Sequence, residues 1–194
     1  GAARPYHRGR GLTRATPMKL HLGCGKRHIP GFVHIDAVEY PHVDHVATID
    51  HLGFLPDDSV ELIYNCHVLE HFRRNDVARV LREWRRVLRP GGTLRVSVPD
   101  FAKLCEVYQR TGELGLVIGP IFGRQDYLYN IHYNVFDEKS LRTLLQDCGY
   151  TDVRRYDWRA TEHAAVDDFS QAYIPHMDRE HGTLISLNVE ATKA

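Results

Sequence analysis

The sequence lacks long apolar runs, a surplus of either charge and closely spaced cysteines. No stretch approaches the roughly 18 apolar residues of a membrane-spanning helix, and none forms the apolar centre of a signal peptide. Lysine plus arginine and aspartate plus glutamate number 25 each, so no overall field attracts polyanions. We therefore expect neither nucleic acid nor a membrane as a partner.

The four cysteines are widely spaced in the sequence. No C-x-x-C pair is present among Cys24, Cys66, Cys105 and Cys148. Free thiols are typical of a reducing compartment, so we expect the protein to be cytoplasmic.

What is present is the composition of one globular domain. Of the 194 residues, 43% are hydrophobic and 26% are charged, and a chain of this length buries roughly 70% of its unfolded surface. Residues 1–17 differ, because they contain four arginines and no acid. We expect 1–17 to form a flexible basic N-terminal arm and 18–194 to form the domain. An arm that closes over an anionic ligand is the alternative.

Apolar stretches that end in small or polar residues predict buried strands. Five such stretches end at Gly23-Cys24-Gly25, Asp36, Asp50, Asn65-Cys66-His67 and Asp100. Two further strands are expected at 151–159 and 183–192. The order of these elements along the chain is that of an α/β protein with a mainly parallel sheet covered on both faces.

Helical periodicity is clearest at 75–92, where apolar residues recur every three or four positions between Asn75, a candidate N-cap, and Pro90-Gly91-Gly92. Further helices are expected at 101–110 and at 137–149, the latter capped by Asp137. Residues 112–136 show no period. We therefore predict a loop-rich acceptor or lid insertion at about 101–136.

The predicted strand ends converge on one edge of the sheet, where open α/β sheets bind ligands. The Gly-x-Gly turn lets the backbone approach a ligand closely, and the carboxylate of Asp36 can accept hydrogen bonds from a ribose diol. Asp50 can accept a hydrogen bond from an exocyclic amine. Each acid alone is more simply a turn or cap residue, but together they favour a nucleoside site.

Three segments in this order carry a family resemblance: "LHLGCGKRHIPGFVHID", "IDHLGFLPDDSVELIYNCHVLEHF" and "VLREWRRVLRPGGTLRVSVPD". They resemble the core of class I S-adenosylmethionine-dependent methyltransferases, of the small methyltransferase-domain-11 type often linked to sugar or surface-polysaccharide biosynthesis. The resemblance covers about residues 18 to 100 and implies a Rossmann-like seven-stranded sheet, order 3-2-1-4-5-7-6, with the last strand antiparallel and helices on both faces.

The resemblance also implies a cofactor, S-adenosyl-L-methionine, with S-adenosyl-L-homocysteine as product and no metal. Glycine-turn residues would face the methionine part, Asp36 the ribose, 50–52 the adenine and 65–67 the sulfonium. The full cofactor-binding set is Leu22, Gly23, Cys24, Gly25, Asp36, Asp50, His51, Leu52, Asn65, Cys66 and His67. The sequence departs from the family pattern in two ways. His21 stands where an acid is common. The connections from Gly25 to Asp36 and from Asp36 to Val43 are short, and the first is too short for the usual helix.

Methyl transfer to a hydroxyl requires removal of a proton, and a histidine can accept it at neutral pH. His132 is the first candidate base and His67 the second, although His132 could equally be a packed loop histidine. Acceptor contacts are expected from Asp100, Tyr127, Tyr129 and Tyr133, for which helix capping and ordinary lid packing are the simpler explanations. The acceptor is a small molecule, a sugar hydroxyl or another natural-product hydroxyl. The oligomeric state is open.

Two alternatives remain. His67-x-x-Glu70-His71 has the spacing of a zinc hydrolase motif, but the third ligand would have to be a distant acid such as Glu138 or Asp147. A module that binds the cofactor without turnover is the other.

Overall fold

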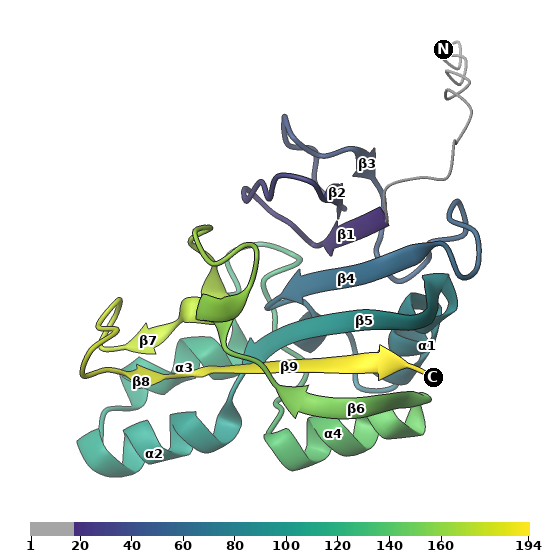
Figure 1. Ribbon diagram of the computed structural model, residues 1–194. Helices are drawn as coiled ribbons and strands as arrows, with labels where there is room; N and C mark the ends of the chain where they lie inside the picture. The colour runs from purple at the N-terminus through teal and green to yellow at the C-terminus, as the bar shows by residue number, and fades with distance from the viewer. Residues whose placement is uncertain (1–17) are drawn as a thin grey trace.

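The computed structural model describes residues 18–194, so the predicted basic arm lies outside the described residues. Seven strands form one sheet in the order β3-β2-β1-β4-β5-β9-β6 (Figure 1). The strands are β1 Met18–Leu22, β2 Val33–Asp36, β3 His45–Val46, β4 Val60–Cys66, β5 Leu88–Pro99, β6 Tyr150–Arg155 and β9 Ser186–Lys193. Strand β9 runs antiparallel to both of its neighbours, and the other pairings are parallel. The expected order is confirmed, because β9 is the seventh strand of this sheet along the chain.

One face of the sheet packs against helices α1 Val77–Val87 and α4 Glu138–Asp147. The buried residues of α1 recur every three or four positions and end at Trp84 and Val87. The indole of Trp84 is fully buried and donates a hydrogen bond to the carbonyl of Ile49 (2.7 Å). This bond fixes the loop after β3 against the helix.

The opposite face is covered by loops in the region of Tyr64. Here Tyr64 and Leu62 pack with Ile29 and Phe32 from the β1–β2 connection. The connection holds no helix, as its length predicted. In the described residues, the helical cover expected on this face is therefore partly replaced by irregular backbone, including the 3-10 turns η2 Trp158–Ala160 and η3 Phe169–Gln171.

A second group of elements extends beyond the carboxyl ends of β4 and β5 (Figure 1). It comprises α2 Phe101–Thr111, α3 Leu114–Phe122 and the two-stranded sheet of β7 Tyr173–Ile174 and β8 Thr183–Leu184. The loop-rich interpretation of 112–136 is wrong for α3. This helix carries apolar residues on all sides and contains Pro120, so it lacks the polar face that reveals a helix in sequence.

Three local expectations also differ from the structure. The third strand ends at Val46 rather than Asp50, and α1 begins after Asp76 without a side-chain cap from Asn75. Pro90-Gly91-Gly92 does not end the helix; it lies inside β5, which begins at Leu88. Glycine and proline signal a change of direction, but β5 continues past them here. It pairs with β4 on either side of them, at Leu88 and at Thr93, and the register shifts in between. No helix within residues 18–194 is long and apolar enough to cross a membrane.

Candidate active site

The glycine turn after β1 adopts a backbone conformation that favours glycine. Gly23 and Gly25 have φ values of +65° and +53°, which favour residues without a side chain. A Cβ on Gly23 would lie 2.5 Å from Cγ2 of Val68. The backbone N–H of Gly25 donates to Oδ2 of Asp36 (2.8 Å), and that of Val38 donates to Oδ1 (2.8 Å). Asp36 therefore fixes the turn while each carboxylate oxygen keeps a lone pair for a ligand.

The end of β4 places an unpaired amide beside this turn. Asn65 pairs in register with Leu22, at the last position of β1. Its side chain is fully buried, and among the described residues neither Oδ1 nor Nδ2 has a hydrogen-bond partner. Buried amides are normally satisfied, so the two unpaired atoms make this strand end a candidate site for a polar ligand. The neighbouring Cys66 stays protonated, because burial raises the pKa of its thiol.

Residues 50–52 are less available to a ligand than expected. Arg79 donates to the carboxylate of Asp50 (3.0 Å). The side chain of Leu52 is buried in the main core, and its N–H donates to Glu83 (2.7 Å). The exposed side chain is that of His51. Any adenine contact from this segment would therefore come mainly from His51 and the remaining lone pairs of Asp50.

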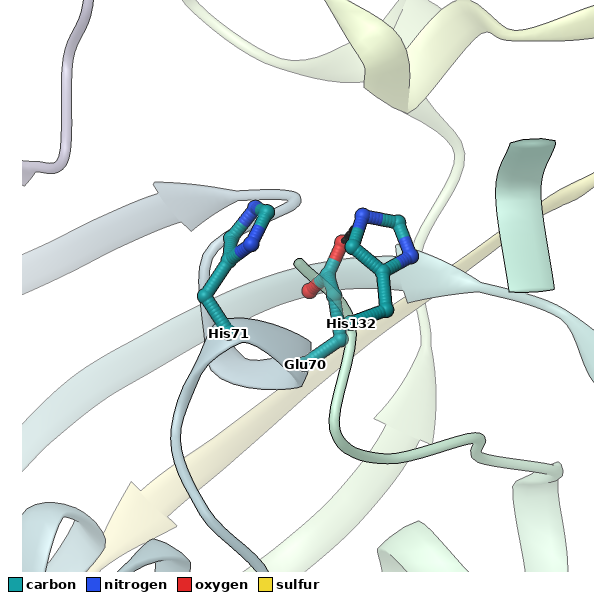
Figure 2. Close-up of side chains that lie close together, drawn as sticks. All are labelled: Glu70, His71 and His132. Atoms are coloured by element: carbon teal, nitrogen blue, oxygen red, sulfur yellow. Dashed lines mark ion pairs between the residues drawn. The ribbon is translucent and has the colours of Figure 1, made fainter. Parts of the chain in front are cut away.

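A cluster of four side chains lies beyond the end of β4: His67, Glu70, His71 and His132, which we call the histidine–glutamate cluster. Glu70 and His71 belong to the 3-10 turn η1 Leu69–His71, and His132 lies in the connection between α3 and α4. Figure 2 shows the carboxylate of Glu70 pointing between the rings of His71 and His132. Backbone pairing of Tyr133 N–H with the Glu70 carbonyl (2.8 Å) joins the two segments.

The hydrogen bonds of His132 fix its tautomer. Its Nδ1 lies 2.8 Å from the carbonyl of Pro120 and must donate to it. Nε2 consequently carries a lone pair, 4.0 Å from Oε1 of Glu70. Burial, with a smaller effect of His71, lowers the pKa of His132 to about 4. The ring is therefore neutral near pH 7.

The tautomer of His67 follows from a chain of hydrogen bonds. The amide of Asn188 donates to the carbonyl of Ser170 (2.9 Å), so its Oδ1 accepts from the hydroxyl of Ser186 (3.0 Å). That hydroxyl then accepts from Nε2–H of His67 (3.1 Å). Nδ1 of His67 is left with a lone pair, 3.6 Å from Glu70 Oε1. His67 also has a φ of +53°, an uncommon conformation for a residue with a side chain.

Glu70 is fully buried, and neither carboxylate oxygen has a hydrogen-bond partner among the described residues. Burial raises the pKa of Glu70 to about 8. Both ring nitrogens of His71 face hydrogen-bond acceptors. Its Nδ1 lies 3.1 Å from the carbonyl of Ile131, and its Nε2 lies 3.1 Å from the carbonyl of His67. A neutral imidazole has one N–H, so one of these pairs lacks a proton.

The predicted acceptor residues occupy different environments. Tyr127, Tyr129 and Tyr133 are 57%, 50% and 40% exposed, as wall residues of an open site would be. Partial burial, and then the neighbouring Tyr40, Asp126 and Asp36, raise the pKa of Tyr127. Asp100 is buried, accepts from the N–H of Lys103 and pairs with Arg155 (3.3 Å). It caps α2, as the simpler explanation held.

The ligand set predicted for a zinc hydrolase, His67 and His71 with a distant acid, is not found in the described residues. His67 precedes the three-residue turn η1 instead of sharing a helix with His71. The proposed third ligand Glu138 is paired with Arg142 and Arg155. The sequence motif pointed to His67, Glu70 and His71. It did not indicate that Glu70 would lack a hydrogen-bond partner or that His132 would lie beside it.

Residues 20–96 match the family model described as "Methyltransferase domain". Together with the sheet order, this match makes the chain similar to the class I S-adenosylmethionine-dependent methyltransferases. Among its relatives are probable S-adenosylmethionine-dependent methyltransferases from two strains of Mycobacterium tuberculosis, CDC 1551 and H37Rv. Each is 34% identical over 128 residues, which are 66% of this chain and 36% of the relative. The matched region thus spans about a third of those proteins.

Solved structures with the same fold include a possible histamine N-methyltransferase from Thermotoga maritima (TM-score 0.56, 16% identity, 92% of this chain and 83% of that one). Another is the 1,6-didemethyltoxoflavin-N1-methyltransferase of Burkholderia thailandensis, with bound 1,6-didemethyltoxoflavin and S-adenosylhomocysteine (TM-score 0.56, 17% identity, 92% and 72% coverage). At these identities the likeness establishes the fold.

Proposed function

We propose that this domain transfers a methyl group from S-adenosylmethionine to a hydroxyl of a small molecule, a sugar or another natural-product intermediate. The observation that carries the proposal is the convergence of the Gly23–Gly25 turn, Asp36 and the unpaired Asn65 at one edge of the sheet. Ligands of open α/β sheets bind at this edge.

The described residues fit the cofactor. Gly25 borders open space, because an added Cβ there would meet nothing within 4 Å. Asp36 can accept from the ribose hydroxyls, and Asn65 offers both a donor and an acceptor to an amino-acid group. When bound, the cofactor supplies an electrophilic methyl group on its sulfonium. The protein then has to hold and align the acceptor.

The histidine–glutamate cluster is the proposed acceptor-hydroxyl subsite. It begins at His67, which follows Asn65 and Cys66 directly, and both candidate bases belong to it. His132 and His67 each present one nitrogen without a proton, which is what a proton acceptor needs. The exposed tyrosines at 127, 129 and 133 provide apolar surface for the rest of the acceptor.

Titration with S-adenosylhomocysteine tests the cofactor site. We expect saturable binding by the native chain and a loss of about 10- to 100-fold in affinity for Asp36→Ala, the equivalent of one or two charge-assisted hydrogen bonds. Asp57→Ala is the matched control, because Asp57 is an exposed acid paired with Arg86 at the surface. Absence of binding by well-folded protein would refute the proposal.

Turnover separates an enzyme from a module that only binds the cofactor. We expect His132→Ala to remove methyl transfer to the accepted hydroxyl compound while its affinity for S-adenosylhomocysteine stays within about twofold, since His132 is not placed on the cofactor. Unchanged turnover would contradict the assignment of His132. Cofactor binding without methyl transfer to any of a panel of hydroxyl and amine acceptors would favour the binding module.

A further inference from the structure

The histidine–glutamate cluster places two imidazole lone pairs around one buried carboxyl group. Nε2 of His132 and Nδ1 of His67 both carry lone pairs, because the other nitrogen of each ring donates its N–H, to the carbonyl of Pro120 and to the hydroxyl of Ser186 respectively. They lie 4.0 and 3.6 Å from the same carboxylate oxygen of Glu70. That carboxylate is completely buried and has no hydrogen-bond donor in the described part of the chain. Buried groups of this kind normally have a partner.

We propose that Glu70, His71 and His132 bind one divalent transition-metal ion of the zinc type. Their ligand atoms all lie within 4.8 Å of one another, and within residues 18–194 no other three histidine, cysteine or acidic side chains do so. Figure 2 shows the carboxylate directed between the two rings. Two imidazoles and one carboxylate suit zinc, iron or nickel, whereas magnesium and calcium prefer oxygen ligands alone.

To hold such an ion, the ligand atoms, which lie within 4.8 Å of one another, must move closer together. Ligand atoms around a tetrahedral zinc lie about 3.3 Å apart, and Nε2 of His132 is 4.0 Å from Glu70. His132 already donates its other N–H to a backbone carbonyl, the arrangement that orients histidine ligands. An ion would also give His71 a partner for its unprotonated nitrogen, whose lone pair now faces a carbonyl oxygen.

The consequence for the reaction rests on the proposed function. An ion at Glu70 would lie in the proposed hydroxyl subsite and lower the pKa of an acceptor hydroxyl that binds it. His132 would then serve as a ligand and would no longer be the base. Acceptors with two neighbouring oxygens, such as a vicinal diol, would be favoured because they can chelate the ion.

Binding of Zn²⁺ and Co²⁺ to the full chain, first stripped with a chelator, tests the inference. We expect about one ion per chain, and a visible Co²⁺ absorption band of a low-coordinate nitrogen–oxygen site. Glu70→Gln and His132→Asn should each weaken binding by at least about 10- to 100-fold. His181→Ala is the control, since His181 is exposed and lies outside the cluster, and it should bind as the native chain does.

Circular dichroism and titration with S-adenosylhomocysteine accompany each variant, so that misfolding is recognised. If Glu70→Gln does not fold, the His132→Asn variant and the Co²⁺ spectrum decide. Equal metal binding by the native chain and both cluster variants, or no binding by the native chain, would overturn the inference. Binding of S-adenosylhomocysteine is measured separately from metal binding. If the native protein binds S-adenosylhomocysteine but no metal, only the metal site is refuted. If it binds metal but not S-adenosylhomocysteine, only the proposed function is refuted.

Discussion

At the scale of single residues, the candidate site depends on two glycines in the turn after β1. Gly23 and Gly25 both have positive φ values, but their surroundings differ. A Cβ on Gly23 would meet Val68, whereas one on Gly25 would meet nothing within 4 Å. The two glycines therefore separate the effect of backbone strain from that of a steric clash.

We predict that Gly23→Ala weakens S-adenosylhomocysteine binding and lowers stability more than Gly25→Ala. Both variants carry the cost of a left-handed alanine, about 1 kcal/mol, but only Gly23→Ala forces Val68 away from the turn. Denaturant unfolding and calorimetric titration measure the two effects. The double variant Gly23→Ala, Val68→Ala should recover part of the stability; if it recovers none, the clash is not the cause.

At the scale of elements, α4 is the helix whose start is most clearly encoded. Asp137 accepts from the N–H of Ser140 (2.7 Å), and the Ser140 hydroxyl lies 3.1 Å from the N–H of Asp137. This reciprocal capping box is readable in sequence because both partners are within one turn. By contrast, the start of α1 at Asp76 has no side-chain cap and was misplaced.

We predict that Asp137→Ala lowers the free energy of unfolding by about 1 kcal/mol, within a range of roughly 0.5–2. The lost interactions are the cap and the favourable placement of a negative charge at the helix N-terminus. Asp147→Ala is the matched control, because this acid ends the same helix, where a negative charge opposes the helix dipole. Urea unfolding should show no loss, or a small gain, for the control.

At the scale of the whole molecule, buried histidines make the fold sensitive to acid. His21 on β1 is 2% exposed and contacts the rings of His34 and Tyr64. Burial, and then the nearby His34 and His163, lower the pKa of His21 from 6.5 to about 3. The unfolded chain therefore binds this proton more readily than the folded one.

The sign of the effect follows from that difference. His21 costs nothing above its unfolded pKa of 6.5, and stability is lost as the pH falls toward its folded pKa of about 3, by at most about 1.4 kcal/mol per pH unit. We predict that His21→Phe loses less stability than the native chain between about pH 6.5 and pH 4. Equilibrium unfolding across this range measures it. Parallel pH profiles would contradict the prediction; His181→Phe, at an exposed site, should match the native profile.

The class of fold and the cofactor edge were predictable because they depend on local patterns. Apolar strands ending at Gly23, Asp36 and Asn65 are each encoded within a few residues, and parallel strands bring their carboxyl ends together. The strand order itself came from family resemblance. Helix α3 was missed because apolar residues lie on all of its sides and leave no period in the sequence, and Asp50 was misplaced because β3 is only two residues long.

The sequence by itself thus determined the kind of sheet, the glycine turn and the acid that supports it. Only the tertiary structure brought Glu70 and His132 together. These residues are far apart in the chain, and their meeting depends on the pairing of Tyr133 with Glu70. The protonation of the histidines depends on distant partners, the carbonyl of Pro120 and the hydroxyl of Ser186. Burial and hydrogen-bond partners are properties of the folded chain, and they turn a short motif into a candidate cation site.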